Sequence, residues 1–435
     1  MEHELSQEPK GLSRRDLIKT SGLVSTAALL AGTGRLWAGG SDKIRIGLIG
    51  CGGRGTYDTP NCLNAAPNVE LVAMGDLFQD RLDRCYGQLA KQLGDKVKVS
   101  PEARFVGWDA HKQVLARDDV DLVILTTPPY FRPAHLRAAV EAGKHVFMEK
   151  PVAVDPVGVR SVMESSGLAD KKKLTIVAGT QGRRMAHLIE GMKRIHNGDI
   201  GEIVAGQCVR IGDGMLTWSE ETRKRQPGWS DMEWQLRRWL FLTWLSGDFI
   251  VEMHIHNLDR VNWAMNAHPV QCMGLGGRQA RTGPEYGDVY DHFAVEYEYP
   301  NGARVEYMGA QIDKASQLQS YRIVGTQGQA YTDSGNLIIK GAKPFTYDGP
   351  QPSPVIQQHA DQIAAIRAGA PLNEGVRVAE STMTCIMGRM SAYTGRALKW
   401  DWAMQASKLD LRPPREEFGD LPMSSVAVPG RTPLL

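Results

Sequence analysis

The sequence predicts an α/β plus α+β protein: a doubly wound parallel sheet in the N-terminal half, then a domain with a large, mostly antiparallel sheet. Buried-type strands alternate with helical segments up to about residue 181, a rhythm typical of parallel sheets covered by helices. Beyond that point, strand-like alternation of apolar and polar residues replaces it. The length of 435 residues accommodates two domains. We place them at 41–181 and 182–435, after a separate segment at 1–40.

The composition excludes several classes of protein. The chain holds 51 basic and 49 acidic residues, a formal charge of +2, so bulk charge gives no reason to expect a nucleic-acid partner. With 42% hydrophobic and 23% charged residues, it is a packed globular protein rather than a disordered one. The six cysteines form no C-x-x-C pair, so we expect neither a disulfide scaffold nor a thiolate zinc site.

The first forty residues resemble a twin-arginine export signal. Residues 13–19, SRRDLIK, precede a small apolar stretch from Ser21 to Gly32. That stretch is shorter than a bilayer span, so a transmembrane helix is the weaker interpretation. A cytoplasmic N-terminus with two chance arginines is the other alternative. We therefore predict a signal peptide at 1–40 and a periplasmic or otherwise exported mature chain without a membrane span.

A short apolar strand at 43–50 runs directly into a glycine motif. Gly50, Gly52 and Gly55 form G-x-G-x-x-G around Gly53 and Arg54. In a Rossmann unit the first glycine permits a tight turn and the second lets the backbone approach a pyrophosphate. The third lets the helix pack close to the strand. The free N–H groups of the next helix favour phosphate, so the motif predicts a dinucleotide site.

The second strand, 69–74, leads to an acid that selects the nucleotide. Asp76 lies 21 residues after Gly55, where the fingerprint places a carboxylate for the adenosine ribose. A carboxylate there repels a 2′-phosphate, so tightly bound NAD is favoured over NADP, although Arg54 and Arg81 lie nearby in the sequence. A simple turn residue at the strand end is the alternative interpretation of Asp76.

Further strand–helix units complete the parallel sheet. Strands are predicted at 121–125, 145–148 and 174–178, with helices at about 132–142 and 156–169. In such a sheet the ligand lies at the carboxyl ends of the strands. The residues that we place on the cofactor are Gly50, Gly52, Gly53, Arg54, Gly55, Asp76, Thr126, Pro128, His135, Glu149 and Lys150.

The second half carries the pattern of an antiparallel sheet. Alternation occurs at 203–211, 292–299, 303–307 and 321–325. Asn301-Gly302 between two of these runs predicts a hairpin. Residues 325–328 predict a further turn.

Three motifs in register resemble the glucose–fructose oxidoreductase/inositol dehydrogenase (Gfo/Idh/MocA) family. They are the glycine motif, the Glu-Lys-Pro run at 149–151, and residues 246–259, SGDFIVEMHIHNLD. Glu252, His256 and Asp259 fill the family's acid, imidazole and aspartate positions. The family usually has Asp where Glu252 stands and Gly where His254 stands. The resemblance covers about residues 43–400 and implies an oxidoreductase whose C-terminal sheet forms a substrate wall and an interface in a homo-oligomer, a dimer or tetramer.

The spacing of the last motif suggests its chemistry. On a helix, positions 252, 256 and 259 share one face, so Glu252 can orient the imidazole of His256. We therefore predict His256 as the general acid/base for a substrate hydroxyl, with Lys150 and Glu252 as its catalytic partners. His254 beside His256 suggests a metal site, but i and i+2 point apart on a helix, so no metal is expected. Buried histidines in a helix at the domain interface are the alternative.

Substrate contacts are predicted at Arg183, His187, His254, Asp259, Trp234 and Tyr290. Six of the ten tryptophans fall between 218 and 263, with basic residues at 223–225, 237 and 238 between them. Indole rings stack on sugar faces, so this region is either a carbohydrate-lined insertion or a helical packing segment.

These residues predict an exported enzyme that moves hydride between NAD and a hydroxyl of a sugar, glycoside or polyol. The resemblance to related exported proteins implies C3 as the specific position. Because free NAD is scarce outside the cytoplasm, the cofactor would be captured during folding and reoxidised in place. A redox-neutral glycosidase, which oxidises transiently, eliminates and reduces again, would use the same groups. A non-catalytic sugar- or NAD-binding protein is a third hypothesis, against which Lys150 and His256 argue.

Overall fold

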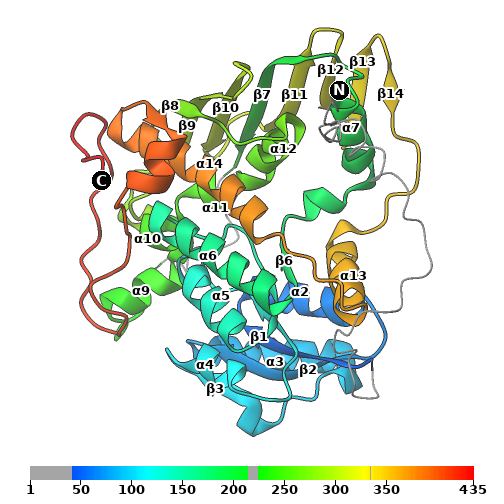
Figure 1. The fold of residues 1–435 in the computed structure, drawn as a ribbon. Coiled ribbons are helices and arrows are strands. Elements are labelled where there is room, and N and C mark those ends of the chain that lie inside the picture. The colour runs from blue at the N-terminus through cyan, green and yellow to red at the C-terminus, as the bar shows by residue number, and fades with distance from the viewer. Residues whose placement is uncertain (1–41, 214–223, 334) are drawn as a thin grey trace, which may run out of the picture. The chain divides into compact units, whose positions relative to one another are not determined.

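Six parallel strands form the first sheet (Figure 1). The computed structural model describes residues 42–213, 224–333 and 335–435; the predicted export signal and the insertion residues 218 and 223 lie outside them. The strand order β3-β2-β1-β4-β5-β6 is that of a Rossmann fold, and every neighbouring pair is parallel. The strands are β1 Ile44–Ile49, β2 Val69–Asp76, β3 Arg104–Val106, β4 Leu122–Leu125, β5 His145–Met148 and β6 Ile176–Ala178.

Helices follow these strands in the alternation that the sequence predicts. They are α2 Gly53–Leu63, α3 Gln79–Leu93, α4 Ala110–Leu115, α5 Arg132–Glu141 and α6 Pro156–Lys172. β1 and β4 are buried along nearly their whole length, which explains why continuous apolar runs marked them. β3 was not predicted, because three half-buried or exposed residues carry no such pattern.

The second sheet has nine strands in the order β14-β13-β12-β11-β7-β10-β9-β8-β15. Its only parallel pair among the described strands is β7 with β10, so the predicted mostly antiparallel sheet is confirmed. The strands are β7 Ile203–Gly212, β8 Gln271–Gly277, β9 His292–Glu298, β10 Arg304–Gln311, β11 Leu318–Gly325, β12 Gly328–Asp333, β13 Asn336–Gly341, β14 Phe345–Thr346 and β15 Leu398–Lys399.

Both predicted turns join antiparallel neighbours in this sheet. The Asn301-Gly302 turn connects β9 to β10, and the side chain of Asn301 accepts a hydrogen bond from the Ala303 N–H at 3.1 Å. β11 and β12 pair through Gly325 and Gly328 with two residues between them.

Helices cover one face of the second sheet, and the other carries exposed apolar side chains. α7 Ala186–His196, α12 Ile255–Met265 and α14 Gly375–Thr394 pack on its strands. The side chains of Tyr297 and Tyr307 point into that core. Met273, Leu275 and Met308, on alternate strand positions of β8 and β10, are 40–63% exposed. No described helix is long and apolar enough to cross a membrane.

Two further segments complete the chain. Short helices lie between β7 and α12: α9 Asp231–Arg237, η5 Trp239–Phe241, α10 Thr243–Ser246 and α11 Phe249–Glu252. α13 Pro354–Arg367 precedes α14, and a π-helix, Trp402–Ala406, follows β15. Residues 407–435, which we call the C-terminal arm, form neither helix nor strand. Figure 1 shows the arm in red, running down to α9 and back.

Candidate functional site

A cleft lies at the carboxyl ends of β1, β2 and β4, where the strand order reverses. Most of the predicted cofactor residues line it: Gly50, Gly52, Gly53, Arg54, Asp76, Thr126, Pro128 and His135. Sequence reasoning missed its aromatic wall, which consists of Phe78, Trp108, Phe131 and Trp239. The first three follow β2, β3 and β4, and the fourth comes from η5, so only the folded chain brings them together.

The glycines of the motif have separate physical roles. Gly50 has a φ of +101°, a conformation that favours glycine. A Cβ on Gly55 would lie 2.1 Å from the Gly50 carbonyl oxygen, so this position holds α2 against β1. A Cβ on Gly52 would meet nothing within 4 Å, and Gly52 lines the cleft. That open space beside the N-terminus of α2 fits the pyrophosphate of a dinucleotide.

Asp76 is held at the end of the cleft where the fingerprint places the adenosine ribose. Its two carboxylate oxygens accept hydrogen bonds from the Cys51 N–H at 2.6 Å and the Phe78 N–H at 2.8 Å. Each oxygen keeps a further lone pair, which leaves capacity for ribose hydroxyls. Burial raises the pKa of Asp76, and these N–H bonds oppose that effect. Arg81 lines the same end of the cleft.

Neither Glu149 nor Lys150 lines this cleft, and their predicted cofactor contacts stay predictions, but the contacts of Glu149 give it a positioning role. Its Oε1 lies 2.6 Å from Nη2 of Arg54, whose Nε lies 3.0 Å from Asp58 Oδ2. Both carboxylates are buried. Burial and the neighbouring charge of Glu149 raise the pKa of Asp58 to about 8. The two acids therefore fix the arginine that lies inside the glycine motif.

The predicted catalytic lysine is joined to the predicted acid. Lys150 follows β5 and its Nζ donates to Glu252 Oε1 at 2.9 Å and to the Glu252 carbonyl oxygen at 2.5 Å. The two side chains are 12% and 13% exposed. Such a largely dehydrated pair holds the ammonium in one place.

Glu252 and His256 do not share one continuous helix, which corrects the sequence prediction. α11 ends at Glu252, His254 caps the next helix, and α12 begins at Ile255. The carboxylate of Glu252 therefore bonds to Lys150 rather than orienting the ring of His256. The i, i+4 argument failed because sequence spacing does not reveal an interruption of two residues.

His256 lies in a positively charged environment in the first turn of α12. Burial, with the charges of Lys150, Arg210 and Arg260, holds the pKa of His256 well below its usual range. The imidazole is therefore neutral at neutral pH, the form that can accept a proton. Among the described residues it has no hydrogen-bond partner.

Arg210 is a site residue that sequence reasoning missed. It lies on β7, and its Nη1 donates to the Met253 carbonyl at 3.2 Å and to Asn257 Oδ1 at 3.3 Å, across the interruption between α11 and α12. The alternation of apolar and polar residues predicted that Arg210 lies in a strand. No sequence signal connects that strand with residues more than forty positions later.

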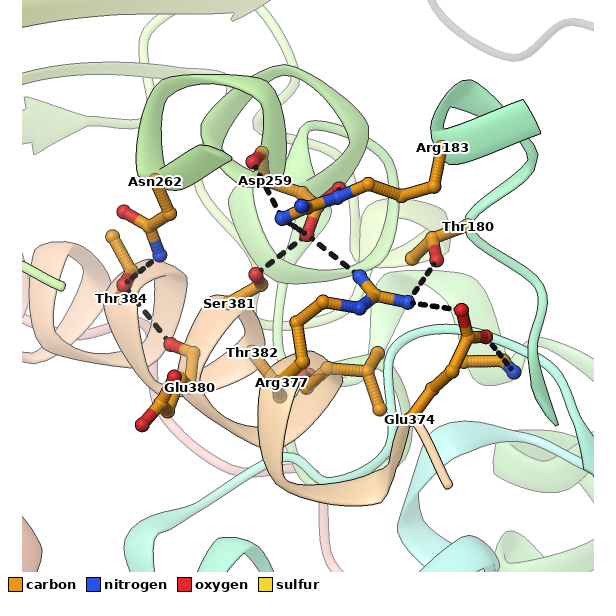
Figure 2. A network of polar contacts seen from close by, with 12 residues as sticks. Thr180, Arg183, Asp259, Asn262, Glu374, Arg377, Glu380, Ser381, Thr382 and Thr384 are labelled. Atoms are coloured by element: carbon orange, nitrogen blue, oxygen red, sulfur yellow. Dashed lines mark hydrogen bonds and ion pairs between the residues drawn. The ribbon is translucent and has the colours of Figure 1, made fainter. Parts of the chain in front are cut away.

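Asp259 is the centre of a polar network that anchors α12 (Figure 2). Its carboxylate accepts from Arg183 at 2.8 and 2.9 Å, from Arg377 at 3.1 Å and from the Ser381 hydroxyl at 2.7 Å. These bonds overcome the effect of burial and hold the pKa of Asp259 well below its usual range. Arg377 also donates to Thr180, just beyond β6.

The predicted substrate contacts of Arg183 and Asp259 are therefore corrected. Their charged groups are bonded to each other, and the guanidinium of Arg183 lies over the ring of Trp263, 4.6 Å from its centroid. We assign the pair to positioning: it holds the helix that carries His256 against the end of the parallel sheet.

Three further substrate candidates are buried packing residues, each exposing 5% or less of its surface. His187 accepts a hydrogen bond from the Leu337 N–H at 3.1 Å. His254 shares one with the Tyr307 hydroxyl at 2.5 Å. Tyr290 donates to the carbonyl of Ala427 at 2.9 Å. Sequence position placed them near the site, but their side chains face the interior.

The tryptophan-rich segment is a helical packing segment in its described part. Trp234 stacks on Trp229 with ring centroids 6.3 Å apart and is absent from the lining of the dinucleotide cleft. Leu236 and Trp239 contribute to that lining instead. The segment therefore covers the nucleotide cleft, while the predicted sugar contact of the half-buried Trp234 stays a prediction. No cluster of metal-ligating side chains occurs among the described residues.

The strand order and the glycine cleft are those of dinucleotide-binding enzymes. Residues 44–180 match the oxidoreductase family with an NAD-binding Rossmann fold, and residues 191–331 match the GFO/IDH/MocA C-terminal domain. The chain therefore belongs to the Gfo/Idh/MocA oxidoreductase family, as its three motifs suggested.

Two curated relatives are similar to part of the chain. A glycosyl hydrolase family 109 protein of Shewanella baltica is 27% identical over 264 residues, which are 60% of this chain and 54% of that protein. An alpha-N-acetylgalactosaminidase of Shewanella oneidensis is 25% identical over the same shares. The chain thus spans about half the length of these relatives.

Solved structures show the same fold. The aldose–aldose oxidoreductase of Caulobacter crescentus, complexed with glycerol, has a TM-score of 0.64 at 19% identity and covers 82% of this chain and 99% of its own. The myo-inositol 2-dehydrogenase of Lactobacillus plantarum has a TM-score of 0.60 at 19% identity, with the same coverage.

Two glycine substitutions should separate folding from nucleotide binding. Gly55→Ala forces a Cβ against a carbonyl and should reduce the free energy of unfolding by about 1–3 kcal/mol. Gly52→Ala, the matched control, should leave the unfolding of nucleotide-free protein within about 0.5 kcal/mol of wild type yet prevent nucleotide retention. Urea denaturation and the nucleotide content of purified protein measure the two effects. Retained nucleotide in Gly52→Ala would contradict the placement of the pyrophosphate.

Asp259→Asn should strongly destabilise the protein at neutral pH. Removing the charge leaves the buried guanidinium of Arg183 without its carboxylate and Arg377 paired with Glu374 alone, a loss of about 3–5 kcal/mol. Because the folded pKa of Asp259 is depressed, its contribution is complete above the ordinary aspartate pKa and is lost as pH falls through the lower folded value. Urea denaturation curves of variant and wild type should therefore converge at low pH. Asp95→Asn, at an exposed ion pair, is the control and should show little change.

Proposed function

We propose that this enzyme uses tightly bound NAD to oxidise a hydroxyl, with C3 as the specific expectation, of a sugar or glycoside. The observation that carries the proposal is the bond between the Lys150 ammonium and Glu252, the last residue of α11, which joins Lys150 to the segment that leads directly into the helix of His256. Lys150 itself follows β5 of the dinucleotide-binding sheet. The bound nicotinamide supplies the hydride acceptor. The protein supplies the group that accepts the hydroxyl proton, the positive charge beside the substrate oxygen and the contacts that hold both groups in position.

Each residue of the site has a separate task in this reaction. His256, neutral for the reasons given above, accepts the hydroxyl proton as the hydride leaves the carbinol carbon. Lys150, held by Glu252, donates a hydrogen bond to the substrate oxygen and stabilises the developing alkoxide. Asp259 and Arg183 keep the helix of His256 in register with Lys150.

The nucleotide preference rests on Asp76. Its carboxylate at the ribose end disfavours a 2′-phosphate and supports NAD. Arg81, at the same end of the cleft, is the feature that would accommodate NADP instead. Denaturing the purified protein and weighing the released nucleotide distinguishes the two, and a mass that corresponds to NADP would overturn this assignment.

A redox-neutral glycosidase is the second candidate. The relatives named glycosyl hydrolase family 109 protein and alpha-N-acetylgalactosaminidase favour it. In that reaction, oxidation at C3 makes the neighbouring C–H acidic, the aglycone is eliminated, water adds, and the ketone is reduced again by the same nucleotide. Release of aglycone from a glycoside panel without an accumulated ketone would identify it; a stable ketosugar would identify the oxidoreductase.

Export and assembly complete the proposal. The SRRDLIK sequence at 13–19 supports twin-arginine export to the periplasm, and retention of an Arg14→Lys, Arg15→Lys variant in the cytoplasmic fraction would test it. The exposed Met273, Leu275 and Met308 on the open face of the second sheet support a dimer or tetramer. A monomer in analytical ultracentrifugation would overturn the latter.

Lys150→Met should abolish turnover while leaving the nucleotide bound. Methionine keeps the volume but removes the ammonium, so kcat should fall by about a thousandfold and the released nucleotide should stay near one per chain. Lys112→Met, at an exposed residue of α4, is the matched control. Unchanged kcat in Lys150→Met, measured as product formed from the active glycoside, would contradict the role assigned to Lys150.

A further inference from the structure

The C-terminal arm crosses the molecule beside the nucleotide cleft, although it has no secondary structure of its own. Its beginning is anchored on the parallel-sheet domain, where Arg160 donates to the Ser407 carbonyl at 3.0 Å and the Leu411 N–H donates to Asp155 Oδ2 at 2.8 Å. Its far end is held on the second domain, where Tyr290 donates to the Ala427 carbonyl and the Gly430 N–H donates to the Thr394 carbonyl. The middle of the arm therefore spans the space between these anchors.

The middle of the arm is bonded to α9. The last turn of α9 and the start of η5 line the cleft. The Met232 N–H donates to the Gly419 carbonyl at 3.1 Å. Gln235 donates to the Leu421 carbonyl at 2.6 Å, and the Leu421 N–H donates to Asp231 at 3.2 Å. Leu236 and Trp239, which line the cleft, thus belong to a helical segment that the arm holds in place.

The same stretch of the arm also touches the wall of the cleft from outside. The ring of Phe418 lies 5.5 Å from that of Trp108 and 6.0 Å from that of Phe78, centroid to centroid. Both partners line the cleft. Beside them, the Tyr130 hydroxyl donates to Glu416 Oε1 at 2.7 Å. Phe78 follows Asp76 by two residues, so this contact is at the adenosine end.

We propose that residues 416–421 form the outer wall of the dinucleotide site and act as a clasp that prevents release of the bound nucleotide. This inference rests on the proposed dinucleotide in the cleft and explains how one nucleotide can serve many turnovers. The arm joins three separate parts of the wall: Trp108 after β3, Phe78 after β2, and α9. Opening the adenosine end requires these contacts to separate together.

Cavities on both sides of the arm show that it is anchored at points rather than packed along its length. One lies between the arm and Trp108, Tyr130 and His135, and includes Glu416 in its lining. The other lies between the arm and Trp244 and Tyr393. A segment attached in this way can separate without unfolding either sheet, which allows loading before the arm is seated.

The test measures nucleotide exchange in purified, nucleotide-loaded protein. The Phe418→Ala, Glu416→Gln double variant should exchange bound NAD for radiolabelled NAD roughly ten- to a hundredfold faster than wild type, because an aromatic contact and a charged hydrogen bond are lost. The matched control is Met423→Ala, Asp95→Asn, which changes no residue of 416–421: Met423 is similarly exposed to Phe418, at 41% against 46%, and Asp95 belongs to an exposed ion pair. It should exchange within about twofold of wild type.

The outcomes separate the two proposals. Equal exchange rates in the Phe418, Glu416 variant and in wild type overturn the clasp while leaving the proposed function intact. A wild-type protein that carries no nucleotide and binds none overturns the proposed function itself. Faster exchange with an unchanged melting temperature of the nucleotide-free protein supports the clasp, because the variant then affects release rather than folding. A chain ending at Leu409, tested in the same way, should exchange at least as fast as the double variant.

Discussion

The bonds of the Asp259 carboxylate with Arg183, Arg377 and Ser381 are the interaction on which the active arrangement depends. Lys150 belongs to the parallel sheet and His256 to a helix of the second half, so neither half contains the site alone. The buried carboxylate, surrounded by donors from η4 and α14, fixes α12 relative to the end of β6. An ion network of this kind contributes position as much as stability, because breaking it leaves charges without partners.

The electrostatics of the site follow from this placement. Lys150 and Arg210 approach His256 from different elements, and their charges together with burial keep the imidazole neutral. The carboxylate of Glu252 is bonded to Lys150. Its negative charge therefore does not offset the positive charges around the His256 ring. A neutral imidazole beside a fixed ammonium is suited to removing a proton from a hydroxyl while stabilising the oxygen that remains.

The floor and the outer wall of the nucleotide cleft come from different parts of the chain. Its floor is local: the glycine turn, Asp76 and the start of α2 all come from one strand–turn–helix–strand unit. Its outer wall is assembled from distant parts, since Trp239 comes from the short helices between β7 and α12 and Phe418 comes from the last twenty residues. The first part defines which class of ligand can bind, and the second controls how readily that ligand leaves.

The sequence by itself determined five of the six parallel strands, the hairpin at Asn301 and the glycine motif. These features are local, because buried strands show continuous apolar runs and the motifs have fixed spacings. Only the tertiary structure decided the partners of Arg183, Glu149 and Glu252 and the burial of His187, His254 and Tyr290. A charged or aromatic side chain pairs with whatever the fold brings within a few ångströms, and sequence spacing holds no information on contacts between residues a hundred positions apart.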